Sequence, residues 1–204
     1  MKQPLLSPNS HGPNRLGLCL ALSLGLTLGC RQLPKERGAQ VQVISSSGLA
    51  ELNPNDVVVA PVQNIMAEGD IPADKIRLAF YSALPRRGYV PLALDFVDRA
   101  VVDASYSPSM LREDAVLQIL IHDWNEALWN VRTVLVVDLE ARMLDSSQPG
   151  APVVWSGRLS GRYDFARDER QFASDQALLQ HACDQLAMEI LSAMPARSTV
   201  PGRN

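Results

Sequence analysis

Hydrophobic residues in the first half of the chain form short runs and one helical stripe. The runs over residues 57–62 and 89–92 are bounded by proline or glycine, which is typical of buried strands or strand ends. The segment between them predicts a helix that Asp70 and Pro72 begin. Its apolar stripe consists of Ile76, Ala79, Phe80, Ala83 and Leu84. A second, short helix is expected over residues 96–104.

From Asp114 onward the hydrophobic period becomes two residues. Three segments alternate apolar and polar side chains as half-buried antiparallel strands do: residues 114–122, 133–143 and 153–162. Turn residues separate these segments at Asn125-Glu126 and over 146–150. In a regular strand, His122 and Asp123 point to opposite faces because they are adjacent. We therefore expect a three-strand antiparallel meander with one polar face.

The last periodic segment is a helix over residues 174–194, with apolar residues at four-residue steps. Cys183 lies in this stripe, so we expect its thiol to be buried, reduced and structurally replaceable. The order β-α-β-α-β-β-β-α predicts an α/β (α+β) fold. In it, a mixed sheet of about five strands, including the antiparallel meander, is covered by helices.

The chain begins with a segment of another kind. Basic residues, Lys2 and Arg15, precede an apolar stretch over 16–28 that ends at Gly29-Cys30, as in a secretory signal. The stretch is shorter than the ~20 apolar residues that a spanning helix needs.

A cysteine directly after a small residue resembles the bacterial lipobox, in which the thiol is diacylated and cleavage leaves the cysteine first. Thr27 and Leu28 depart from that pattern, so an ordinary secretory signal with a chance cysteine is the alternative. The resemblance implies acylation of Cys30, attachment to the membrane through its acyl chains, and a periplasmic domain. Arg31 in place of an aspartate favours the outer membrane, by resemblance to Gram-negative lipoproteins.

These patterns predict a domain plan with a single folded body. Residues 1–29 are the lipoprotein signal peptide, 30–54 the lipidated cysteine and a tether, and 55–195 one α/β periplasmic domain. Residues 196–204 are expected to be a frayed tail, because they follow Pro195 and contain further turn residues.

Charge excludes one class of partner. The chain has a formal net charge of −3, and removal of Lys2 and Arg15 with the leader would make it −5. A nucleic-acid-binding protein would show a basic face instead. Attachment to anionic lipid by charge is disfavoured for the same reason, which leaves acyl chains as the anchor.

Candidate chemistry is sparse. The sequence has no Gly-x-Ser-x-Gly elbow, no His-Glu-x-x-His pair and no Cys-x-x-Cys pair. After processing, His122, His181 and Cys183 would be the remaining histidines and thiol. We therefore expect no enzyme activity, no metal site and no cofactor.

Aromatic residues on the meander give the candidate contact. Trp124 and Trp129 flank the polar turn Asn125-Glu126, where full burial of a ring is difficult. Tryptophan is enriched at interfaces because one flat ring buries a large area. We predict that Trp124, Asn125, Glu126 and Trp129 bind a protein partner, or stack on a sugar, whereas Trp155 packs the sheet against a helix.

Several short motifs carry a family resemblance. They are Val57-Val58-Val59-Ala60-Pro61, Gly88-Tyr89-Val90-Pro91-Leu92, Asp114-Ala115-Val116-Leu117, Leu144-Asp145 and Val154-Trp155-Ser156-Gly157. In this order they resemble a group of outer-membrane lipoproteins with a fold like the TolB amino-terminal domain and the curli-secretion pore lipoprotein. The insertion over 148–152 lengthens the last hairpin. Such families include secretion pores, exopolysaccharide-export rings and activators of peptidoglycan synthases.

The function that follows from this resemblance is structural. We expect a lipid-anchored envelope protein that self-associates or serves as an assembly component of an export or transport complex. The alternative is a periplasmic regulatory binding module for a cell-wall enzyme or glycan. The fold does not choose between them.

Overall fold

The computed structural model describes residues 40–66, 69–101 and 108–198. The signal segment 1–29, Cys30 and the first part of the expected tether lie outside the described residues. None of the helices within the described ranges is long and apolar enough to cross a membrane.

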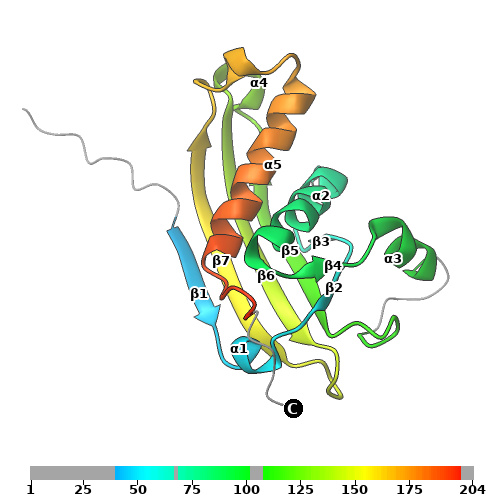
Figure 1. Cartoon of the computed structure of the whole chain (residues 1–204). Coiled ribbons are helices and arrows are strands. Elements are labelled where there is room, and N and C mark those ends of the chain that lie inside the picture. The colour runs from blue at the N-terminus through cyan, green and yellow to red at the C-terminus, as the bar shows by residue number, and fades with distance from the viewer. Residues whose placement is uncertain (1–39, 67–68, 102–107, 199–204) are drawn as a thin grey trace, which may run out of the picture. The chain divides into compact units, whose positions relative to one another are not determined.

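A mixed seven-stranded sheet forms the centre of the domain, in the order β1-β7-β6-β5-β2-β4, with β3 beside β5 (Figure 1). The strands are β1 (Gln40–Ser45), β2 (Asp56–Val59), β3 (Gln63–Asn64), β4 (Val90–Pro91), β5 (Ala115–Asn125), β6 (Val134–Asp145) and β7 (Val153–Asp164). From β1 to β5 the neighbours are antiparallel, and β2, β3 and β4 join in parallel. The expected mixed sheet with a meander is confirmed, and β1 and β3 are additional strands.

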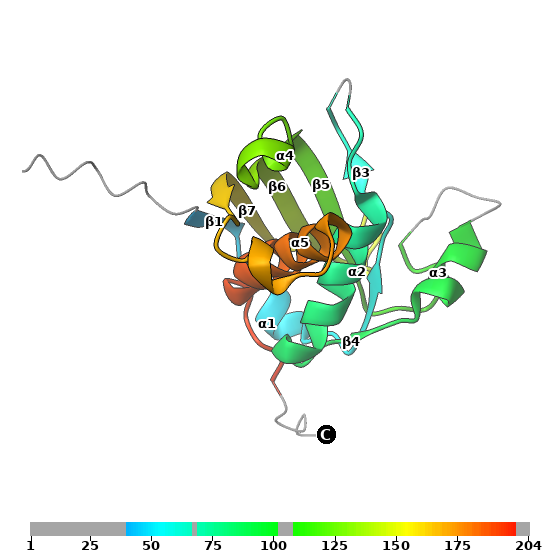
Figure 2. The same cartoon turned by 90° about the horizontal axis from the view of Figure 1, so that it is seen from above.

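Two helices cover one face of this sheet, α2 (Ala73–Ala83) and α5 (Asp175–Ser192) (Figure 2). The Ser174 hydroxyl caps α5 by accepting a hydrogen bond from the amide of Ala177 at 3.2 Å. The sequence placed the start of α2 at Asp70, but Pro72 is its N-cap. The main core forms between these helices and the inward-facing residues of the meander, such as Ile119, Leu139 and Leu159.

A second, smaller core lies on the other side of β2 and β5, under α3 (Leu94–Val101). Its buried members are Val58, Ala60, Val97, Val116 and Leu144. Arg77 of α2 ties the two sides together. Its buried guanidinium donates two hydrogen bonds to the carbonyl of Val59, at 3.0 and 2.9 Å, and one to Asp98 of α3 at 2.5 Å.

Both ends of the domain extend beyond the expected boundaries of 55 and 195. The segment assigned to the tether contains β1 and the short helix α1 (Leu49–Leu52), whose Leu49 is buried. At the other end, the amide of Arg197 donates to the carbonyl of Arg87 at 2.8 Å, and the amide of Ser198 donates to Asn53 Oδ1 at 2.8 Å. Arg197 and Ser198 are therefore hydrogen-bonded to the domain rather than frayed, and the rest of the expected tail, 199–204, lies outside the described residues.

Candidate interaction surfaces

A β-bulge at His122 decides which side chains of β5 enter the core. Ile121 pairs with Leu139 of β6, but the next pairs are Asp123 with Asp138 and Trp124 with Val137. One extra residue in β5 therefore shifts the alternation by one position. Strict alternation had put His122 and Asp123 on opposite faces. The extra residue instead places Asp123 opposite Asp138 on the polar face, and Trp124 turns inward.

The expectation that the two tryptophans resist full burial is wrong. Trp124 and Trp129 are each 7% exposed and belong to the main core. The indole Nε1 of Trp124 donates to Glu126 Oε1 at 2.6 Å, so the turn carboxylate satisfies the polar atom of the ring. Trp129 packs against Phe165, with ring centroids 5.9 Å apart.

The surface of this turn carries other apolar residues instead. The connection between β5 and β6 contains the short helix α4 (Trp129–Arg132), and we refer to residues 125–133 as the α4 tip. Leu128 is exposed and Val131 is 79% exposed. Thr133 ends the helix at φ 55°, a conformation that is costly for a β-branched residue.

Asn125 and Glu126 stabilise the tip through hydrogen bonds. Asn125 Oδ1 accepts the amide of Ala127 at 2.9 Å, and Glu126 holds Trp124 as described above. The predicted contact at this turn stays a prediction, but its apolar area would come from Leu128 and Val131 rather than from the indoles. No periodicity marks these two residues, because α4 is only one turn long.

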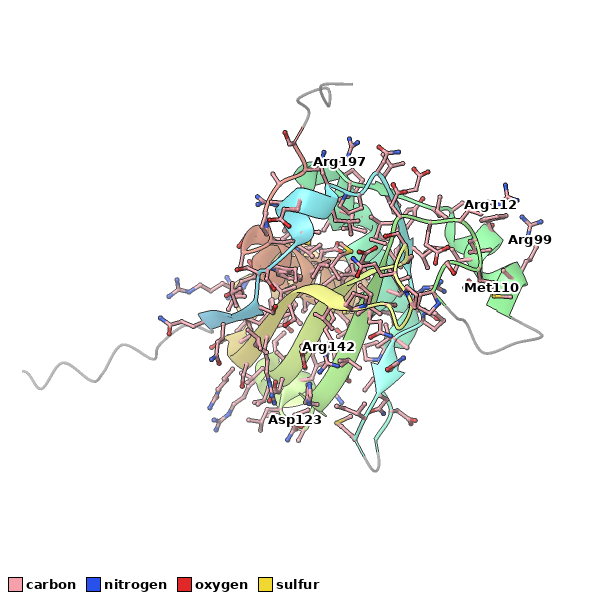
Figure 3. All side chains as sticks on the ribbon, turned by 90° about the horizontal axis from the view of Figure 1, so that it is seen from below. Arg99, Met110, Arg112, Asp123, Arg142 and Arg197 are labelled. Carbon is pink, nitrogen blue, oxygen red and sulfur yellow. The ribbon has the colours of Figure 1, made fainter. Side chains whose placement is uncertain are left out.

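The opposite face of the meander is polar and carries a buried carboxylate. Glu140 of β6 is 4% exposed, and its two oxygens accept hydrogen bonds from Arg142 at 2.6 and 3.0 Å. Nε2 of His122 lies 3.1 Å from the same carboxylate. Burial alone would raise the pKa of Glu140, but the hydrogen bonds from Arg142 and His122 hold it below its ordinary value. Figure 3 shows Arg142 and Asp123 on this face of the sheet.

A second ion pair continues the same face toward β7. Arg158 donates two hydrogen bonds of 2.7 Å to Asp138, in the bidentate geometry that is strongest for this pair. These bonds lower the pKa of Asp138. The buried and half-buried carboxylates of this face, Glu140 and Asp138, are thus each paired with an arginine, whereas Asp123 is exposed.

Cys183 lies where its stripe predicted, buried on α5 and without a disulfide. Burial, aided by the negative charge of Asp184, raises the pKa of its thiol to about 12, so the thiolate is not available as a nucleophile at neutral pH. His181 is engaged by Gln185, with 3.0 Å between their Nε2 atoms. Within the ranges that the structure describes, no three His, Cys, Asp or Glu side chains form a group that could hold a metal ion.

Among the hollows on the surface of the described domain, two are of interest here. One, of about 390 Å³, lies between α2 and α5 and is lined by the exposed apolar residues Leu78 and Met188 together with Arg86 and Asp184. The other, of about 900 Å³, lies between the 108–113 loop and the β6–β7 turn. Beside the second hollow, Arg99, Met110 and Arg112 lie on the side of the domain that carries α3 (Figure 3).

Comparison with known proteins finds similar folds among solved structures. No family model and no curated protein matches the sequence. The solved PelC dodecamer from Paraburkholderia phytofirmans is similar at 19% identity and a TM-score of 0.50, covering 78% of this chain and 99% of that chain. Lipoprotein GNA1162 from Neisseria meningitidis is similar at 18% identity and a TM-score of 0.44, covering 66% of this chain and 97% of that chain.

These likenesses concern the fold and not a shared activity. The expected likeness to the TolB amino-terminal domain and the curli-secretion pore stays a prediction. The chain has the fold of a PelC subunit over nearly the whole length of that subunit.

Proposed function

We propose that the protein is a lipid-anchored component of the bacterial cell envelope that self-associates and takes part in assembling an export or transport complex. The observation that carries this proposal is the fold, which matches 99% of a subunit whose solved structure is a dodecamer. The acyl anchor on Cys30 and the outer-membrane location are parts of the same proposal and rest on the Gly29-Cys30 pattern and on Arg31, respectively.

The proposed mode of action is binding rather than catalysis. Glu140 and Asp138 of the polar face are paired with Arg142 and Arg158, and the thiol of Cys183 is buried and protonated at neutral pH. The α4 tip, in contrast, exposes Leu128 and Val131 at the end of a rigid meander. Exposed apolar side chains surrounded by polar groups are the usual core and rim of a protein–protein contact.

The molar mass of the full chain tests this proposal. Light scattering on the protein extracted in a mild detergent, over a wide concentration range, should give a multiple of the subunit mass. A monomer at every concentration would overturn the proposed self-association.

A tip variant then tests which surface takes part. We expect Val131→Asp to lower the order of the assembly, because a carboxylate would replace a buried contact. The control is Val153→Asp, an exposed valine on β7. Equal behaviour of the two variants would remove the α4 tip from the assembly.

The polar sheet face favours a second candidate, a regulatory module that binds a cell-wall enzyme or glycan. This candidate predicts a monomer that sediments with isolated peptidoglycan. It also predicts that Arg158→Gln weakens this binding, because Arg158 is half-buried and lies on the polar face.

A further inference from the structure

β1 is an open edge of the sheet. It pairs with β7 on one side, and no described strand pairs with its other side (Figure 1). The six residues Gln40–Ser45 contain no charged side chain and no proline. Proteins usually block such an edge with lysine, proline or a very short strand, because its unpaired backbone groups attract another strand. β4, at the opposite edge, has two residues, one of them a proline, and is blocked in this way.

Apolar side chains accompany the open backbone of β1. Val43 is 44% exposed and Ile44 is 52% exposed. The ladder with β7 shifts between Val43 and Ser45, which leaves Ile44 without a partner across the strands. The edge therefore offers both unsatisfied hydrogen-bonding groups and uncovered apolar area at one place.

We infer that β1 pairs antiparallel with β1 of a second copy of this chain, around a twofold axis perpendicular to the sheet. This inference rests on the proposed self-association and names a surface for it in addition to the α4 tip. An axis in this direction keeps each face of the sheet on the same side in both copies. The main-chain groups that point away from β7 would then complete a ladder between two six-residue strands.

The side chains of β1 are complementary to themselves in this arrangement. Gln42 pairs with Arg158 on the polar face, whereas Val41 and Val43 pair with Leu159 and Gly157 on the helix-covered face. An axis at Gln42 sets Val41 opposite the partner's Val43, and β-branched pairs stabilise antiparallel strands. No like charges meet, because the strand has none. A second copy is therefore the occupant that this edge fits.

Lysine substitutions at the two edges test the inference in the full chain extracted in detergent. Val43→Lys breaks the Val41–Val43 pairs, sets the two lysines diagonally across the proposed axis, and should raise the concentration for half-dissociation by about tenfold or more. The matched control is Val90→Lys, since Val90 is 49% exposed on β4 at the other edge. Circular dichroism and the melting temperature establish that both variants fold.

A cysteine cross-link tests the twofold geometry directly. In a Cys183→Ala background, Gln42→Cys should oxidise to a disulfide-linked dimer, because position 42 meets itself at the axis. Ser160→Cys, one strand further in on the same face, should stay monomeric on a non-reducing gel. The parent chain controls for Cys19 and Cys30.

The outcomes separate this inference from the proposed function. A monomer at all concentrations overturns both. An oligomer that responds equally to Val43→Lys and Val90→Lys, or that responds only to Val90→Lys, overturns the β1 pairing and leaves self-association in place. Selective loss with Val43→Lys, together with the cross-link at position 42, supports the β1 pairing.

Discussion

Glu140 shows how a single residue organises the polar face of the meander. A carboxylate taken out of water is costly unless its oxygens are satisfied, and here Arg142 and His122 supply the donors. Because Arg142 lies on the same strand and His122 on its neighbour, the cluster links β5 and β6. Regular alternation from Ile121 puts His122 on the polar face beside Glu140, and the bulge then adds Asp123 to the same face.

Replacement of this carboxylate should change stability in a pH-dependent way. We expect Glu140→Gln to lower the free energy of unfolding by about 2 kcal/mol at neutral pH, because it removes charge-assisted hydrogen bonds. The pKa of Glu140 is lowered in the folded state, so its contribution is present above the ordinary value of 4.5 and is lost as the pH falls below it. In urea unfolding, the difference in stability between the variant and the parent should therefore be present at pH 7 and shrink near pH 3. Asp123→Asn, an exposed carboxylate on the same side (Figure 3), is the control and should show little difference at either pH.

The burial of the two indoles gives a second prediction at this scale. Trp124→Ala and Trp129→Ala should each lower the free energy of unfolding by about 3–5 kcal/mol, because a large core side chain leaves a cavity. Val131→Ala, on the exposed side of the same tip, should change it by less than about 0.5 kcal/mol. Thermal denaturation measures all three. Unchanged melting temperatures for the tryptophan variants would place the rings outside the core.

At the scale of elements, the inward packing of the second half of β5 depends on one extra residue, His122. The first half of β5 follows the alternation of a regular strand, and the bulge restores inward packing for Trp124 after Asp123 has been added to the polar face. The strand can therefore end in a wide turn while both halves contribute to the same core.

Single-residue deletions test this account of the bulge. Deletion of His122 should preserve the register on both sides of the bulge. It should lower the free energy of unfolding by only about 1 kcal/mol, because the contact with Glu140 is lost. Deletion of Leu120 should lower the free energy of unfolding by about 3 kcal/mol or more. The strand would keep its pairing from Asp123 onward only by losing the bulge, and this would turn Ile121 outward and His122 into the core. Equal losses in chemical denaturation would show that the register does not depend on the extra residue.

At the scale of the whole molecule, the two faces of the sheet have different roles. α2 and α5 bury the main core on one face (Figure 2), and α3 covers only the part of the other face around β2. The polar part of the meander, the α4 tip and the β1 edge stay open. Such a domain can be held at a membrane by a tether while its free surfaces meet other proteins.

The anchor itself is tested by fractionation. Cys30→Ala should move the protein from the membrane to the soluble fraction, because the diacyl group supplies the stable attachment. Cys183→Ala, which changes only the buried thiol, should remain in the membrane. Mass spectrometry of the mature N-terminus should find an acylated Cys30, and an unmodified cysteine would contradict the lipobox assignment.

Local pattern in the sequence was enough to predict α2, α5 and the three long strands, because helix and strand periods are written in neighbouring residues. It also placed Cys183 in the core. It did not predict the burial of Trp124, since the bulge at His122 is visible only when β5 is set against β6, or that of Trp129, which packs against Phe165 after β7. β1 lies among glycine and serine residues and becomes a strand by pairing with β7, more than a hundred positions later in the chain. Tertiary structure decided these points because each depends on a partner that is distant in sequence.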